Sequence, residues 1–277
     1  MSTFVDFCRC LGIVIDAEPA IGRWVRLPTV THPRKRNGAV KFMGDHGFAQ
    51  EHSTMTEVAV WKPEGVAHQV DHDANARRVQ AAQREIEAKQ RAAAERAEWI
   101  LSQCSLDIHP YLKAKGFPEE RANVWETDDK ARLLVIPMRV DGRIVGCQLI
   151  DEAGEKRFLS GQRTSDAAFI INNRGPAVLC EGYATALSIR AALIAMKARY
   201  TLFVCFSAHN LGRVAKTLPV GLVVADNDQS GTGERIARET GWPYFMPPTV
   251  GHDFNDFHRA TTLFKCSQAL RSALLKT

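Results

Sequence analysis

The segment VVADNDQSGTGERIA, residues 223–237, decides the fold. It joins an apolar run, two acids one residue apart, a glycine-containing turn and the start of a helix. An apolar run without polar alternation is typical of a strand buried on both faces. Asp226 and Asp228 then follow directly, although two like charges repel each other. We expect a strand–turn–helix unit whose acids lie at the carboxyl end of a parallel sheet.

The neighbouring segments repeat this alternation over residues 176–260. Predicted strands and helices follow one another as AVLC (177–180), GYATALSIRAALIAMKA (182–198), TLFVCFS (201–207), NLGRVAKTL (210–218), VGLVVAD (220–226), TGERIARETG (232–241) and PYFMPP (243–248). Apolar strands that alternate with helices predict a parallel sheet covered on both faces.

Acids fall just after the predicted strands of this unit. Glu181 follows the first strand, Asp226 and Asp228 follow the third, and Asp253 and Asp256 follow the last. Clustered carboxylates raise each other's pKa unless a cation neutralises them. Oxygen ligands without Cys or His favour Mg²⁺ or Mn²⁺, which can orient phosphates and activate a hydroxyl. The alternative is that each acid is a turn former or helix cap.

Three motifs, VLCEGYATALSI (178–189), VVADNDQSGTGERIA and GHDFNDF (251–257), together resemble a TOPRIM domain. This metal-binding fold is shared by bacterial-type primases, type IA and type II topoisomerases and some nucleases. The preceding HPYLKAKG (109–116) and RLLVIPMRVDGRIVGCQLIDEAGEKRFLSG (132–161) resemble the basic N-terminal half of the catalytic core of phage and plasmid primases. The resemblance covers about residues 107–258. It implies an α/β fold with a TOPRIM parallel sheet flanked by helices and preceded by an α+β primase subdomain.

The resemblance also implies roles for individual residues. Glu181 would be the catalytic acid, either as a metal ligand or as the base that deprotonates the attacking 3′-hydroxyl. Asp226 and Asp228 would hold Mg²⁺ or Mn²⁺ against the triphosphate of a ribonucleotide, with Asp253 completing the acidic edge. Phosphate contacts supply most sequence-independent affinity for nucleic acid. The basic residues implied to bind nucleotide or single-stranded DNA template are Lys156, Arg157, Lys113, Lys115, Arg132 and Arg139.

Three departures from bacterial cellular primases change the expectations. Thr185 and Asn255 stand where those enzymes carry further acids, which leaves the number of bound metals open. Cys8 and Cys10 lie within a predicted helix instead of forming a paired Cys-x-x-Cys ribbon. This is poor zinc geometry, so we expect no zinc site.

The chain before the core divides into two parts. Residues 1–66 predict a small β-rich domain, because FVDFCRCLGI (4–13) has helical spacing and the segments after it alternate like short antiparallel strands. Trp24, Trp61, Phe42 and the basic cluster from Arg34 to Lys41 could form a template-binding face. The alternative is that the tryptophans close the core of a small sheet. Residues 67–105, rich in helix formers, predict a long exposed linker helix.

Two further segments complete the predicted organisation. Residues 106–175 form the α+β half of the core, in which VDGR (140–143) between two apolar strands predicts a hairpin. Residues 261–277 predict a C-terminal helix, which either packs on its own domain or docks a partner. A Gly-x-x-x-x-Gly-Lys-[Ser/Thr] phosphate loop is missing from the sequence, so unwinding is expected from a separate helicase.

The bulk composition is that of a globular protein. The chain has 277 residues, 45% of them hydrophobic and 24% charged, with a net charge of +5 that permits a polyanionic partner. No run reaches the length of a membrane span, and the N-terminal segment is not that of a signal peptide. Seven cysteines, an odd number, indicate a reducing compartment, so we expect a cytoplasmic protein.

The leading hypothesis is a DNA primase, a nucleotidyltransferase that makes short RNA primers on single-stranded DNA for a phage or plasmid. One alternative is a TOPRIM nuclease, in which water replaces the 3′-hydroxyl. The other is a non-catalytic nucleic-acid-binding adaptor of replication.

Overall fold

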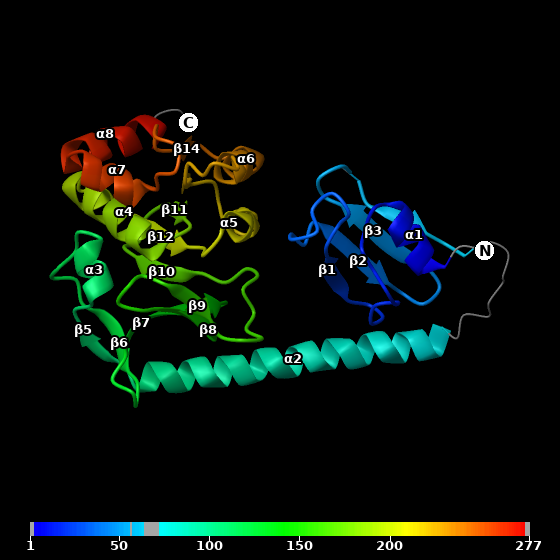
Figure 1. The fold of residues 1–277 in the computed structure, drawn as a ribbon. Helices are drawn as coiled ribbons and strands as arrows, with labels where there is room; N and C mark the ends of the chain where they lie inside the picture. Colours follow the sequence, from blue (N-terminus) through cyan, green and yellow to red (C-terminus); the bar gives the residue numbers. More distant parts are fainter. Residues whose placement is uncertain (1–2, 56, 64–71, 275–277) are drawn as a thin grey trace. The chain divides into compact units, whose positions relative to one another are not determined.

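The computed structural model describes residues 3–55, 57–63 and 72–274. These residues form a mixed α/β protein with several separate sheets (Figure 1). The chain divides into two compact units, Met1–Ala88 and Lys89–Thr277. No helix among the described residues combines the length and the apolar character that crossing a membrane requires.

The N-terminal unit is a four-stranded antiparallel meander with one helix packed on it. Its elements are α1 (Phe4–Cys10), β1 (Trp24–Leu27), β2 (Gly38–Phe42), β3 (Gly47–Glu51) and β4 (Ala59–Trp61), and the strands pair in chain order. The ring of Phe4 on the helix lies 5.1 Å from that of Phe42 and 5.6 Å from that of Trp61. The predicted helix and short antiparallel strands are therefore confirmed.

Two residues of the predicted template-binding face lie in this core. Phe42 and Trp61 are only 7% and 8% exposed, because strand alternation turns both toward α1. For these two rings the alternative holds, and they close the core of the small sheet instead of facing a ligand. Trp24 is 48% exposed and lies on the other side of the sheet from the core residue Val25.

Helix α2 (His72–Ser102) is exposed only in part. Val79 and Ile86 are open to solvent, as expected for a linker. Near its C-terminus, however, Ala97 and Ile100 are buried against Val135 and the core around it. The prediction of an exposed linker helix over 67–105, of which 67–71 lie outside the described residues, is therefore wrong for this last part, where small and apolar side chains recur on one face.

The second unit begins with an antiparallel sheet in chain order. Its elements are β5 (Ser105–Asp107), α3 (Pro110–Ala114), β6 (Ala122–Glu126), β7 (Arg132–Val140), β8 (Arg143–Ile150) and β9 (Lys156–Phe158). Asp141 and Gly142 join β7 to β8 with positive φ angles of 49° and 78°. This is the conformation that two-residue hairpins prefer, and the predicted hairpin is confirmed.

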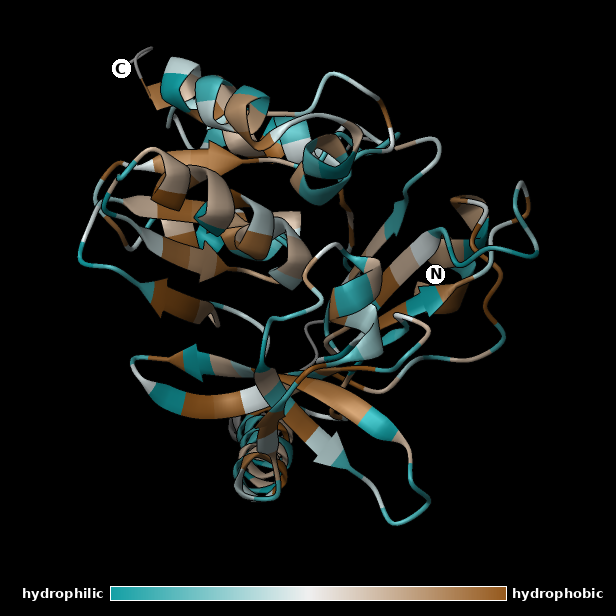
Figure 2. Ribbon diagram, turned by 90° about the vertical axis from the view of Figure 1, so that its left-hand side faces the viewer, coloured by the Kyte–Doolittle hydropathy of each residue, from teal (hydrophilic) through white to brown (hydrophobic). Residues whose placement is uncertain are grey.

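The other sheet of this unit has the strand order β10-β12-β11-β13-β14. Its strands are β10 (Phe169–Asn172), β11 (Ala177–Cys180), β12 (Thr201–Val204), β13 (Leu222–Val224) and β14 (Tyr244–Phe245). All neighbours pair in parallel except β10, an antiparallel edge strand that the sequence pattern did not indicate. In Figure 2 the strands of this sheet are mainly brown, as expected for strands buried on both faces.

Helices cover both faces of this sheet. They are α4 (Tyr183–Ala195), α5 (Ala208–Ala215), α6 (Thr232–Glu239), α7 (Phe254–Ala260) and α8 (Leu263–Leu274). Alternate strand residues divide between the faces, so that Val178 packs with α4, α7 and α8 whereas Leu179 packs with α5 and α6 (Figure 1). Cys266 and Leu270 of α8 are buried in the first of these clusters. The C-terminal helix thus packs on its own unit.

Candidate functional site

The candidate site lies where β11 and β13 end side by side. From β11 the chain moves first to β12 on one side and then through β13 to β14 on the other. Loops diverge at such a reversal and leave a crevice beyond the carboxyl ends of the strands, where ligands of open α/β sheets bind. Leu179 pairs with Val223 in parallel register. Continuing this register places Glu181 level with Ala225, adjacent to Asp226.

Asp226 is the most perturbed acid of this edge. Its Oδ1 is buried and has no hydrogen-bond partner among the described residues. The pKa of Asp226 is raised to about 8, first by burial and then by the charges of Glu181 and Asp253, while the charge of Lys156 opposes the shift. A carboxyl group with this pKa retains its proton at neutral pH unless a cation replaces that proton.

Glu181 has a similar environment. Burial raises the pKa of Glu181, and the charge of Asp228 adds to this, while the backbone N–H of Ala208 and the charge of Lys156 lower it. The backbone is held in place because the carbonyl of Glu181 accepts a hydrogen bond from the N–H of Phe206 (2.9 Å). Both half-buried acids therefore favour the arrival of positive charge.

Asp228, two residues after Asp226, has the opposite environment. Its Oδ2 accepts from the backbone N–H of Gly233 (2.7 Å), and its Oδ1 accepts from the N–H and hydroxyl of Ser230 (N–H at 2.9 Å). These bonds, that of the Ser230 hydroxyl first, lower the pKa of Asp228 to about 2. A Cβ at Gly233 would lie 2.2 Å from the carbonyl oxygen of Asp226, so the turn requires glycine there. Repulsion between the two acids is thus reduced because Asp226 is neutral when its partner is charged.

Asp253 caps helix α7. Its side chain accepts from the N–H of Asp256 (2.9 Å), whose carboxylate accepts from the N–H of Asp253 (3.2 Å). Asn227 ties this segment to the end of β13, because its N–H donates to the carbonyl of His252 (3.0 Å) and its Nδ2 to that of Pro247 (2.8 Å). Asp253 is therefore close enough for its charge to raise the pKa of Asp226, although its own carboxylate faces the end of α7.

Of the predicted basic residues, Lys156 is the one whose charge affects the pKa values of the acids. It is exposed on β9, and its charge lowers the pKa of both Glu181 and Asp226. Arg157 points to the other side of the strand and pairs with Glu155 (2.9 Å). The structure thus brings Lys156, and not Arg157, to the acidic edge.

The other four basic residues are placed elsewhere. Arg132 and Arg139 lie toward opposite ends of β7 and donate to Asp107 (2.6 Å) and to the carbonyl of Gly142 (3.1 Å). Lys113 lies on α3 and Lys115 forms its C-cap. Among the described residues no hydrogen bond or ion pair joins these four side chains to the acids. A template path over them remains a prediction.

The acids have the ligand chemistry that a hard divalent cation requires, but their side chains do not already surround a metal position. All donors are oxygens, and Asp226 offers a buried one without a partner. In the part of the chain that is described, no three His, Cys, Asp or Glu side chains already form a metal-binding group. The carboxylates of Asp228 and Asp253 are hydrogen-bonded to helix ends. Mg²⁺ commonly keeps several waters and binds one or two carboxylates together with phosphates, which Asp226 and Glu181 could supply.

The cysteines considered for a zinc site, Cys8 and Cys10, lie in the N-terminal unit and not near these acids in the sequence. Cys8 is buried in the core of the N-terminal unit and Cys10 is exposed. All seven cysteines are free thiols. Cys8 is thus a small packing residue of this core.

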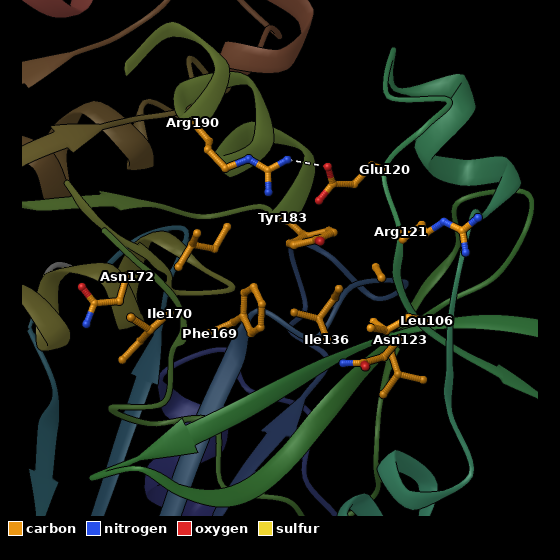
Figure 3. Close-up of a pocket in the computed structure, with 13 residues that line it drawn as sticks. Leu106, Glu120, Arg121, Asn123, Ile136, Phe169, Ile170, Asn172, Tyr183 and Arg190 are labelled. Atoms are coloured by element: carbon orange, nitrogen blue, oxygen red, sulfur yellow. Dashed lines mark hydrogen bonds and ion pairs between the residues drawn. The ribbon is translucent and has the colours of Figure 1, made fainter. Parts of the chain in front are cut away.

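A cavity of about 390 Å³ lies away from the acids, between β6, β7 and β10 and the start of α4 (Figure 3). Phe169 and Tyr183 meet edge to face in its wall, with ring centroids 5.6 Å apart. Glu120 and Arg190 form an ion pair at its margin. The acids of the candidate site do not line it. The sequence carried no signal for this cavity, because distant segments with ordinary core residues form it.

Comparisons with known proteins leave the family open. A scan against models of protein families matches none of them to this chain, and a search of curated proteins finds no significant match. The functional interpretation therefore depends on the geometry of the chain and on the resemblance of its motifs.

Proposed function

We propose that the chain is a DNA primase of the phage and plasmid type with a TOPRIM catalytic domain. It would join ribonucleotides on single-stranded DNA, in the cytoplasm and beside a separate helicase. The observation that supports this most is the meeting of Glu181 and Asp226 at the reversal point of the parallel sheet, with Lys156 beside them. This is where an open α/β sheet binds phosphate-bearing ligands.

Each residue has a defined task in this proposal. Lys156 attracts the triphosphate of the incoming nucleotide and remains exposed to receive it. Glu181 accepts the proton of the attacking 3′-hydroxyl at its carboxylate, and its raised pKa brings its basicity closer to neutral pH. Mg²⁺ or Mn²⁺, held by Asp226 with Asp228 and Asp253 at the edge, would neutralise phosphate charge as a Lewis acid.

Primer synthesis is the direct test. The full chain is incubated with single-stranded DNA, labelled ribonucleoside triphosphates and Mg²⁺ or Mn²⁺. We expect short labelled RNA from the wild type and none from Glu181→Gln, which keeps the shape of the side chain and removes its charge. Glu234→Gln is the matched control, because Glu234 lies on α6 and pairs with Arg238 outside the site. Equal synthesis by Glu181→Gln and wild type would refute the proposed site.

A second function is favoured by one observation. The carboxylates of Asp228 and Asp253 serve helix ends, which suits a protein that binds nucleic acid without turnover. Binding of single-stranded DNA without RNA synthesis would support this adaptor role. Cleaved DNA in the same assay would indicate a nuclease that uses water in place of the 3′-hydroxyl.

A further inference from the structure

A row of side chains crosses the sheet of the N-terminal unit on the face opposite α1. In the strand register Trp24 pairs with Lys41, Lys41 with Phe48, and Phe48 with Val60. Directly paired residues project from the same face of a sheet. The residues that alternate with them, such as Val40, lie in the core with α1. We call Trp24, Lys41, Phe48 and Val60 the aromatic row.

The rings of the aromatic row are open on one side. Trp24 is 48% exposed, and its ring lies 6.3 Å from that of Phe48 at an angle of 41°. His46 meets Phe48 edge to face at 5.3 Å. Val60 is 53% exposed at the end of the row. Clustered apolar side chains on an exposed face are typical of interaction sites.

The charge of this face identifies the kind of partner. Arg26 projects beside Trp24, and Lys41 lies between the two aromatic strand positions. No acid occupies the positions of β1 to β4 that face this way. Asp45, on the turn between β2 and β3, is bonded to His46 (2.7 Å). Exposed rings with cations beside them are complementary to unpaired bases joined by phosphates.

We propose that the aromatic row binds single-stranded nucleic acid. Bases stack on Trp24 and Phe48 while backbone phosphates contact Lys41 and Arg26. Stacking on rings is independent of base identity, because every base has a π-face, so the row binds strands of any sequence. The site is separate from the acidic edge and goes beyond the proposed catalytic function.

Fluorescence quenching by an oligothymidylate tests the position of the bound strand. We expect the strand to quench the wild type, measured without divalent cation, and Trp24→Phe to lose most of this quenching. Trp99→Phe is the matched control, because Trp99 is similarly exposed (45%) but lies on α2 beneath Arg96 (4.1 Å). Undiminished quenching in Trp24→Phe would overturn the proposal.

Affinity measurements separate stacking from charge. Trp24→Ala with Phe48→Ala should weaken binding of the oligothymidylate by roughly 30-fold or more, since each of the two stacked bases contributes at least about 5-fold. An abasic oligomer of equal length should bind the wild type and this variant equally, since it keeps the phosphates. Equal affinity of both proteins for the oligothymidylate overturns the proposal. Both rings lie outside the core of the unit, and circular dichroism checks that the variant is folded.

The outcomes are distinguishable from those of the primase assay. Glu181→Gln should retain full quenching at Trp24, because it leaves the aromatic row unchanged. Loss of primer synthesis would then not imply loss of strand binding, and loss of strand binding would not by itself refute the catalytic site. Absence of quenching, together with self-association that Trp24→Ala abolishes, would overturn the proposal and indicate a protein interface instead.

Discussion

Replacing Asp226 by Asn should stabilise the protein in the absence of divalent cations, and increasingly so as the pH rises. The folded-state pKa of Asp226 is raised from 3.8 to about 8, first by burial. Between these values the unfolded chain has lost a proton that the folded chain still binds, so stability falls as the pH rises. An amide has no such proton and removes this pH dependence.

The magnitude follows from the size of the pKa shift. Each pH unit between the two pKa values changes the free energy of unfolding by about 1.4 kcal/mol. Between pH 5 and pH 7 the advantage of Asp226→Asn should therefore grow by about 2.5 kcal/mol. For a unit of this size that corresponds to a melting-temperature difference of roughly 5–10 °C.

Calorimetry of the full chain in EDTA at pH 5, 6 and 7 measures this difference. Asp228→Asn is the control, because the pKa of Asp228 is shifted in the opposite direction and its replacement should lower the stability. The pKa of Asp228 is lowered to about 2, first by the Ser230 hydroxyl, so its charged form stabilises the fold above pH 4 and this stability is lost only as the pH falls through about 2. This variant should be destabilised equally at pH 5 and pH 7. A melting temperature of Asp226→Asn no higher than that of the wild type at pH 7 would show that Asp226 does not have the raised pKa.

The remaining predictions concern the cation, the turn and the thiols. Millimolar Mg²⁺ should raise the melting temperature of the wild type at pH 7 but not that of Asp226→Asn, and an equal response in both would place the cation elsewhere. Gly233→Ala should cost at least about 2 kcal/mol in chemical unfolding, since its Cβ would lie 2.2 Å from a backbone oxygen, whereas Gly182→Ala meets only an ordinary contact at 3.4 Å. A thiol reagent should modify exposed Cys10 first and leave Cys180 unmodified until the protein unfolds, because burial raises the pKa of that thiol; early modification of Cys180 would contradict this.

Local sequence patterns determined which elements form and in which order. The strand–helix alternation after residue 176 is recognisable because strands buried on both faces need continuous apolar runs, and the hairpin at Asp141 and Gly142 because few residues adopt its backbone conformation. The carboxyl ends of parallel strands share one edge. The sequence could therefore also predict that Glu181 and Asp226 would lie close together.

The environment of each side chain was decided only by the tertiary structure. Asp226 and Asp228 have the same chemistry and nearly the same sequence position, but Asp226 has a buried oxygen without a partner whereas Asp228 is hydrogen-bonded to its own loop. Likewise, sequence could not distinguish the buried ring of Trp61 from the exposed ring of Trp24. The physical reason is that burial and hydrogen bonding depend on which distant segments pack against a residue, and local sequence carries little information about that packing.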